Sequence, residues 1–166
     1  MQLPYFKQET HYTCGPACLR MILAGNGIHQ SERTLATLSE QNVRHGTRRA
    51  AMVVTLRRFG VRCSVFPQGT LTQLLTTVRA GRSVLVNFRE PSEDEGHYAI
   101  VTGENDGTML LHDPLNGKNF PMTRREFSKR WLGYKSPAPN VGWMVIPTMV
   151  TSSRSAAPAT EKRQRR

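Results

Sequence analysis

The sequence lacks the apolar segments that would place a protein in or across a membrane. Its 166 residues contain no long uncharged apolar run, so we expect no transmembrane helix. The first ten residues, MQLPYFKQET, have no apolar signal-peptide core, so we expect no secretory route. Internal repeats and the motifs typical of DNA- or RNA-binding proteins are also missing. These absences favour a single globular domain.

Cysteine is scarce. Cys14, Cys18 and Cys63 make an odd number without the spacing of a disulfide framework, which favours a reducing, cytoplasmic setting. Cys14 and Cys18 are one helical turn apart, as a metal or redox pair would be, but no second pair of ligands completes a zinc site. We therefore expect no metal and no cofactor, and we expect Cys18 and Cys63 to pack in the core.

Positive charge is abundant and unevenly distributed. The formal net charge is +11, and residues 154–166 hold five Lys/Arg and one Glu. The end of the chain is rich in Ser, Thr, Ala and Pro without periodicity, which predicts one domain over residues 1–150 and a basic, disordered tail over residues 151–166. Such a tail either contacts nucleic acid or an acidic partner, or serves only as a solubilising extension. The sequence carries no indication of oligomeric state.

The most informative stretch of the sequence runs from Gln8 to Leu23. Pro16 suits the first turn of a helix, where its missing N–H would have no partner. Between residues 17 and 24 the only polar side chain is Arg20, so a helix over residues 15–25 is apolar nearly all round and must be central. Cys14 then lies at the positive end of a helix dipole, where a thiolate is stabilised.

Hydrophobic periodicity predicts helices early in the chain and strands later. Further helices are expected at residues 32–40, 47–59, 70–81 and 123–131, and strands at residues 61–67, 83–88, 97–103, 108–114 and 142–146. In the helix at 47–59 we expect apolar side chains to face the core and arginines to face solvent: Ala50, Val53, Val54 and Leu56 inside, Arg48, Arg49, Arg57 and Arg58 outside. This order indicates an α+β fold with a mostly antiparallel sheet.

The hairpin over residues 97–114 contains the best pairing of a histidine with a carboxylate. If its turn is centred near Asn105, His97 directly faces Asp113, with Cβ atoms roughly 5 Å apart. Such a pair can hydrogen-bond, which fixes the imidazole tautomer and stabilises the imidazolium. A register shift of one residue would place the two side chains on opposite faces. The other histidines have no comparable partner in the sequence: His11, His29, His45 and His112.

An acidic loop directly precedes His97 at residues 90–96, and we expect it to be exposed. Its acidic side chains are Glu90, Glu93, Asp94 and Glu95. Two interpretations stay open: the loop borders the active-site cleft and favours basic substrates, or it is a solvated turn.

Three motifs resemble the C39 family of cysteine peptidases and its standalone C39-like relatives. They are Gln8 followed by Cys14-Gly15-Pro16-Ala17-Cys18, then His97-Tyr98-Ala99-Ile100-Val101, then Asp113-Pro114, in a collinear match from about Leu3 to Pro147. The best-known members are peptidase domains of bacteriocin transporters, which cut leader peptides after a double glycine. The resemblance implies a papain-like α+β fold, with N-terminal helices around a central nucleophile helix packed on a C-terminal, mostly antiparallel sheet.

The resemblance also implies the site residues. It makes Cys14 the nucleophile, His97 the general base and acid, Asp113 the orienting residue and Gln8 the side chain of the oxyanion hole. A peptide or protein substrate would then be cleaved through an acyl-enzyme. Thr13 replaces an Asp that is frequent in transporter domains, and no transporter segments follow Pro147, so we do not carry over the double-glycine rule.

Two alternatives to this interpretation remain open. The same triad could pass its acyl group to an amine or thiol as an acyltransferase or transpeptidase, or cut isopeptide bonds. A basic nucleic-acid- or protein-binding module without catalysis is the third class, although the basic residues are scattered and no aromatic residues are interleaved with them.

Overall fold

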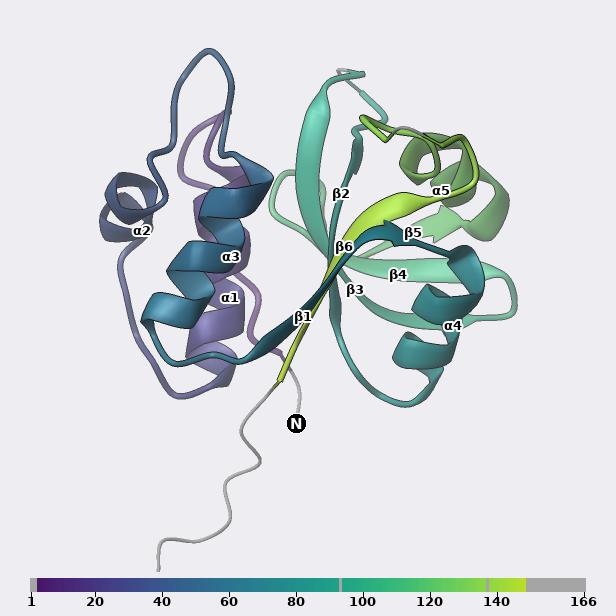
Figure 1. Cartoon of the computed structure of the whole chain (residues 1–166), viewed down its shortest axis with the longest axis horizontal. Helices are drawn as coiled ribbons and strands as arrows, with labels where there is room; N and C mark the ends of the chain where they lie inside the picture. The colour runs from purple at the N-terminus through teal and green to yellow at the C-terminus, as the bar shows by residue number, and fades with distance from the viewer. Residues whose placement is uncertain (1–2, 93, 137, 149–166) are drawn as a thin grey trace, which may run out of the picture.

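A six-stranded antiparallel sheet separates two groups of helices in the computed structural model (Figure 1). The structure describes residues 3–92, 94–136 and 138–148, and the tail predicted for residues 151–166 lies outside them. The strands follow the order β1-β6-β2-β3-β4-β5. Their bounds are β1 (Cys63–Gly69), β2 (Val84–Arg89), β3 (Gly96–Asn105), β4 (Thr108–Asp113), β5 (Gly117–Thr123) and β6 (Gly142–Pro147). The predicted α+β class is confirmed.

Helices cover both faces of the sheet. One layer consists of α1 (Cys14–Gly25), α2 (Glu32–Leu38) and α3 (Arg49–Arg58); α4 (Leu71–Arg79) and α5 (Arg124–Trp131) cover the other face (Figure 1). Thr70 caps the N-terminus of α4 with a capping box. Its side chain accepts a hydrogen bond from the Gln73 N–H, and the Gln73 side chain accepts one from the Thr70 N–H. Within the described residues no helix combines the length and the apolar character needed to cross a membrane.

Alternating side chains divide the core into two clusters. Leu85, Ile100 and Val145 pack with α1–α3, whereas their neighbours Val86 and Val101 pack with α4 and α5. This alternation is the period of two expected for strands buried on both faces. The helix α1 is buried almost all round, as predicted, so the packing of this central helix fixes the position of Cys14.

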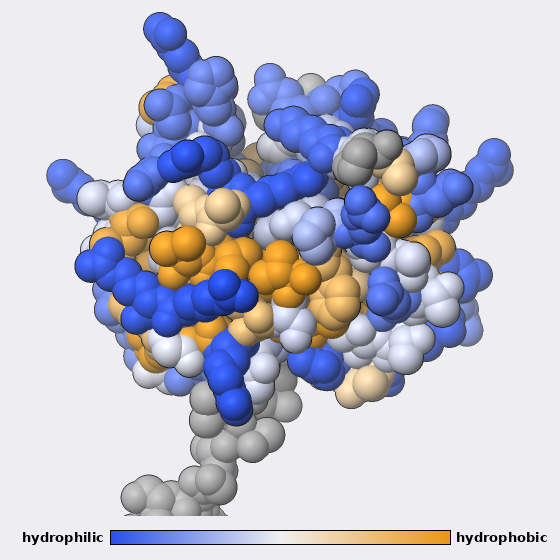
Figure 2. Space-filling view, in the orientation of Figure 1, coloured by the Kyte–Doolittle hydropathy of each residue, from blue (hydrophilic) through white to orange (hydrophobic). Residues whose placement is uncertain are grey.

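Two predictions about secondary structure are wrong. The strand β5 was not expected, because Gly117–Thr123 shows no clear alternation of apolar and polar residues. In α3 the inward face is formed by Met52, Val53, Thr55 and Leu56. Ala50 and Val54, which were expected inside, are exposed, and Arg49 is half-buried rather than facing solvent. In the view of Figure 2, apolar surface gathers over the junction of the helical layer and the sheet, below a rim that is hydrophilic on both sides.

The register of the β3–β4 hairpin differs from the predicted one. Its turn is Asp106-Gly107, both with positive φ (46° and 81°), and Asn105 faces Thr108. The register shifts between Val101 and Gly103, and beyond that shift Ile100 faces His112. Continued along the ladder, this register puts Asp113 opposite Ala99, so His97 and Asp113 are diagonal neighbours. The bulge is what returns them to one face.

Candidate active site

Cys14 is the first residue of α1 and is buried in the structure. The N-cap residue Thr13 makes no side-chain capping bond, because its hydroxyl is engaged with Thr10. Gly15 is required by packing, since a Cβ there would lie 2.8 Å from Thr47 Oγ1. Cys14 is thereby held at a helix N-terminus whose first amides are not capped by a side chain within the described chain.

His97 lies near the start of β3 and hydrogen-bonds Asp113 at the end of β4. The distance from His97 Nε2 to Asp113 Oδ1 is 2.7 Å, and both residues are buried. Cys14 lies close to the His97 ring, and both residues line one cleft. Because Asp113 takes Nε2, Nδ1 is the ring nitrogen that is left for Cys14. Burial alone would lower the pKa of His97, but the hydrogen bonds with Asp113 and Cys14 raise this pKa to about 10.

The Asp113 carboxylate has donors on both oxygens. Oδ1 also accepts from the Leu115 N–H (2.9 Å) and the Asn116 N–H (3.1 Å), and Oδ2 accepts from Asn116 Nδ2 (3.2 Å). Burial would raise the pKa of Asp113, but the hydrogen bonds from His97 and Asn116 lower this pKa below its ordinary value. The carboxylate is therefore held ionised and oriented toward the imidazole.

Glu90 belongs to this polar network. It is 2% exposed, and its Oε1 accepts from Asn116 Nδ2 at 2.9 Å, so one amide joins two buried carboxylates. Glu90 Oε2 accepts from the Ser92 N–H at 2.6 Å and the Ser92 hydroxyl at 2.7 Å. The expectation that all four acids of the loop take part in its exposed charge is therefore wrong for Glu90, whereas Glu93 lies outside the described residues.

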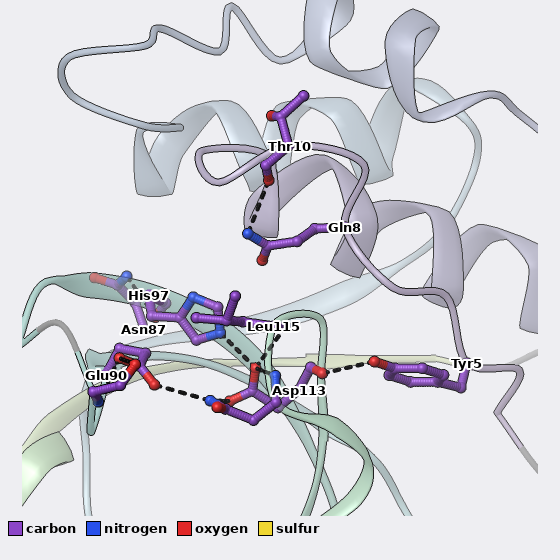
Figure 3. A network of polar contacts seen from close by, with 10 residues as sticks. Tyr5, Gln8, Thr10, Asn87, Glu90, His97, Asp113 and Leu115 are labelled. Carbon is purple, nitrogen blue, oxygen red and sulfur yellow. Dashed lines mark hydrogen bonds and ion pairs between the residues drawn. The ribbon is translucent and has the colours of Figure 1, made fainter.

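Gln8 approaches the site from the helical layer. Its side chain lies between Thr10 and the His97 ring in Figure 3. Gln8 Nε2 donates to the Thr10 carbonyl at 2.9 Å, while Oε1 is buried and has no hydrogen-bond partner among the described residues. The second N–H of this amide is left for another acceptor.

The N-terminal segment joins the two halves of the site. The carbonyl of Leu3 is 3.1 Å from His112 Nε2, the Tyr5 hydroxyl donates to the Asp113 carbonyl (3.1 Å), and the Gln8 N–H donates to the Pro114 carbonyl (3.0 Å). The four predicted site residues, from two distant parts of the sequence, are thus brought together: Gln8, Cys14, His97 and Asp113. Figure 3 shows three of them, Gln8, His97 and Asp113. Sequence reasoning had no way to find these contacts, because each pairs a side chain with a distant main-chain group or two main-chain groups.

A cleft of about 480 Å³ contains Cys14 and His97. Asp94 and Glu95 line it, which agrees with the acidic loop bordering the cleft. Asp94 is paired with Arg89 at 3.1 Å and with Arg130 at 3.7 Å. Other basic side chains, including Arg44 and Lys135, line the same cleft. The acidic loop therefore does not make the cleft uniformly negative.

The other cysteines lie away from the cleft. Cys18 is completely buried, and this burial, with the nearby Cys14, raises the pKa of its thiol well above the ordinary value. Cys63 on β1 is half-buried, and all three cysteines are free. Within the described ranges no group of three or more His, Cys, Asp or Glu side chains is placed to hold a metal ion.

Sequence reasoning missed Asn116 and Asn87 beside the site, and it missed the inward position of Arg49. Arg49 Nε donates to Asn87 Oδ1 at 3.0 Å, and Asn87 Nδ2 donates to the His97 carbonyl at 3.1 Å. A charged residue in an amphipathic helix is usually placed on the solvent side, and the sequence around Arg49 contains no sign that it turns toward the sheet.

Comparisons with known proteins agree with this site. A sequence model of the Peptidase C39 family matches residues 2–135. An uncharacterised protein of Methanothermobacter marburgensis is 28% identical over 127 residues, which are 76% of this chain and 82% of that protein. Cysteine protease effector 1 of Escherichia coli O1:K1:H7 is 26% identical over 131 residues, which are 77% of this chain and 25% of that protein.

The fold has solved counterparts. The peptidase domain of Streptococcus ComA, a bifunctional ABC transporter involved in a quorum-sensing pathway, is similar with a TM-score of 0.72 and 20% identity, over 88% of this chain and 98% of that domain. C39 peptidase domains have a papain-like fold, so the papain-like architecture expected from the sequence is confirmed.

Proposed function

Because the chain belongs to the peptidase C39 family and is a cysteine-type peptidase, we propose that it cleaves peptide bonds with Cys14 as the nucleophile, His97 as the general base and acid, and Asp113 as the orienting residue. The observation that carries this proposal is the position of one imidazole between a thiol and a carboxylate. His97 bonds Asp113 at 2.7 Å through Nε2, and its Nδ1 is left for the nearby Cys14. That arrangement pairs a nucleophile with a base and the base with an orienter.

In the proposed hydrolysis, the His97 imidazole transfers protons on the side of Cys14 while Asp113 orients its other nitrogen. His97 takes the Cys14 proton, and the thiolate attacks the carbonyl carbon, forming a C–S bond while the carbonyl electron pair moves to oxygen. When the tetrahedral intermediate collapses, the C–N bond breaks and His97 gives its proton to the leaving amine. His97 then takes a proton from water, the hydroxide attacks the thioester, and the C–S bond breaks to restore Cys14 and release the acid.

The negative oxygen needs donors on the helical side of the cleft. We assign this role to the Cys14 N–H, at the uncapped start of α1, and to the second N–H of the Gln8 amide. Gln8 is buried and fixed by its bond to the Thr10 carbonyl, so it would not need to reorganise during the reaction. A preorganised donor of this kind is worth roughly 100- to 1000-fold in rate.

We place this activity on peptide or protein substrates in a reducing compartment. The cleft of about 480 Å³ beside Cys14 is lined by charged side chains of both signs, and all three cysteines are free. Hydrolysis is preferred to acyl transfer because the sequence and the described residues offer no device that would keep water from the acyl-enzyme. Mass spectrometry of the products distinguishes the two, since transfer to an added amine gives a heavier adduct.

The experiment that tests the proposal is alkylation of Cys14 by iodoacetamide as a function of pH. A Cys18→Ala, Cys63→Ala background leaves Cys14 as the single thiol, and His97→Ala in this background is the comparison. We expect rapid alkylation at pH 6 that is lost in the His97 variant, because an imidazolium keeps the thiolate ionised. Reactivity rising only around the ordinary thiol value of about pH 8.5 in both proteins would overturn the proposal.

A further inference from the structure

Arg49 joins three parts of the fold that meet beside the cleft. It is the first residue of α3, and its Nε donates to Asn87 on β2 at 3.0 Å. Its Nη1 donates to the Lys135 carbonyl at 3.1 Å and its Nη2 to the Tyr134 carbonyl at 3.0 Å, in the segment after α5. Every nitrogen of the guanidinium is therefore used, and none of these bonds stays within the helical layer.

The guanidinium of Arg49 also lies within cation–π distance of the Trp143 ring. The Arg49 Cζ lies 5.6 Å from the Trp143 ring centroid, and Trp143 is buried on β6. Arginine combines stacking with a rigid set of donors, whereas lysine offers a point charge on a flexible stem. Arg49 is thus held as a rigid bridge from the helical layer to the sheet.

The bridge ends on the main chain of His97. Asn87 is buried, faces Tyr98 across the β2–β3 ladder, and donates from Nδ2 to the His97 carbonyl at 3.1 Å. Arg49 and Asn87 also line, together with Cys14, a cavity of about 280 Å³. The contacts therefore run from the layer that carries Cys14 to the residue that carries the imidazole.

We propose that Arg49 is a positioning residue of the peptidase, which acts through Asn87 to hold His97 within reach of Cys14. This inference rests on the proposed function of Cys14 and His97. Cys14 belongs to the helical layer and His97 to the sheet, so the approach of their side chains depends on the spacing of these two layers. A rigid fork that takes acceptors from β2 and from the segment after α5 fixes this spacing beside the reacting groups.

The neighbouring Arg48 provides a matched control. Its side chain is 74% exposed and its ion pair is with Glu40, within the helical layer. Arg48→Ala and Arg49→Ala remove the same charge from adjacent positions, but only the second removes the bridge. Arg49→Lys keeps the charge and most of the stem while losing the fork, and it serves if Arg49→Ala folds poorly.

The test measures alkylation of Cys14 by iodoacetamide from pH 5 to pH 10 without substrate, then kcat/KM on a cleaved peptide. We expect Arg49→Ala and Asn87→Ala to lose most of the alkylation at pH 6 and to lower kcat/KM roughly 10- to 100-fold, by analogy with the loss when residues that orient metal-bound histidines are removed. Arg49→Lys should show the same loss in part, and Arg48→Ala should keep the wild-type alkylation profile. The double variant Arg49→Ala/Asn87→Ala should be no worse than either single variant, because both act on one path.

The outcomes separate this inference from the proposed function. If the wild-type protein shows no reactivity at pH 6, the proposed function fails. If the wild type shows it and Arg49→Lys keeps the full profile, or Arg49→Ala behaves like Arg48→Ala, only the inference is overturned. A loss in Arg49→Ala that is equal at every pH and matches the fraction unfolded in a thermal melt would also overturn it, because such a loss would mean a structural role alone.

Discussion

The two sides of the cleft differ in how many of their polar groups already have hydrogen-bond partners. On the sheet side, Asp113 accepts four hydrogen bonds and His97 is bound through its ring and its main-chain carbonyl. On the helical side, the Cys14 N–H lies at a helix start without a side-chain cap, and Gln8 Nε2 donates only one of its two N–H groups, to the Thr10 carbonyl. Polar groups that are already satisfied cost nothing to reorganise, whereas unsatisfied ones remain available to a ligand. We therefore expect the proposed base to be in place before substrate arrives, and the proposed oxyanion donors to be left for the substrate.

The largest effect should come from breaking the sheet side at Asp113. Asp113→Asn keeps the shape of the side chain but places an amide against donors that now meet a carboxylate, so His97 loses the acceptor that fixes its tautomer. We expect kcat to fall by about 10⁴-fold, the size seen when the orienting carboxylate of a related triad is replaced. Steady-state kinetics on a cleaved peptide measure the loss, and Cys14→Ser gives the inactive reference. A loss below tenfold would mean that Asp113 does not orient the base.

A smaller effect is expected from Gln8 on the helical side. Gln8→Ala removes one proposed donor without touching Cys14, His97 or Asp113, and kcat should fall roughly 100- to 1000-fold with little change in KM. Gln8→Glu keeps the length but presents a negative charge to the oxyanion, so it should be no better than alanine. Equal activity of the wild type and both variants would show that this side contributes no donor, and the contrast between the two sides would disappear.

The parts of this site that local sequence patterns predicted are those fixed by local structure. Cys14 is set by the Pro16 turn and the apolar helix behind it, and both are visible as composition. The pairing of His97 with Asp113 was predicted for a register that the structure does not have. The predicted turn was too early and the bulge was not predicted. Together these two errors shift the register by two residues, and an even shift leaves His97 and Asp113 on the same face of the sheet.

The supporting residues could not be predicted, because their partners are distant in sequence. Glu90 was placed in an exposed acidic loop and Arg49 on a solvent face, since acidic and basic side chains are seldom buried without partners. Their partners, Asn116 and Asn87, become visible only once β2, β3 and β4 are assembled. The sheet strand β5 was missed for a related reason: it is an edge strand whose pairing with β4 does not need an alternating pattern.

A smaller loss of activity is expected when the hydrogen bond from Asn116 to Asp113 is removed. Its amide is the side-chain donor to Asp113 Oδ2, but Asn116 is exposed, so water can replace part of its role in Asn116→Ala. We expect kcat/KM to fall about 10-fold. The pKa of His97, raised to about 10 by its partners, should fall as Asp113 becomes less well held, so the basic limb of the pH–rate profile should move to lower pH.

A control separates Asn116 from the acidic loop. Ser92→Ala removes a hydroxyl that donates to Glu90 but leaves the amide of Asn116 in place. Its basic limb should stay at the wild-type pH. If both variants move the basic limb of the pH–rate profile equally, the acidic loop rather than the Asn116 amide orients Asp113.

The smallest effect should appear in the stability of the free protein, where no substrate is involved. In the folded state the pKa of His97 is raised to about 10, against an ordinary value of 6.5, so unfolding between these pH values releases a proton. The stability contributed by the protonated imidazole is therefore complete below about pH 6.5 and is lost as the pH rises toward about 10. Thermal melts of the wild type should fall more steeply over this range than those of His97→Ala, by about 2–4 °C for each kcal/mol of linked stability. The exposed His29 supplies the control, because melting temperatures of His29→Ala should follow those of the wild type. If the melting temperatures of all three proteins changed with pH in parallel, His97 would not be held in place before substrate binds. Substrate would then assemble both sides of the cleft alike.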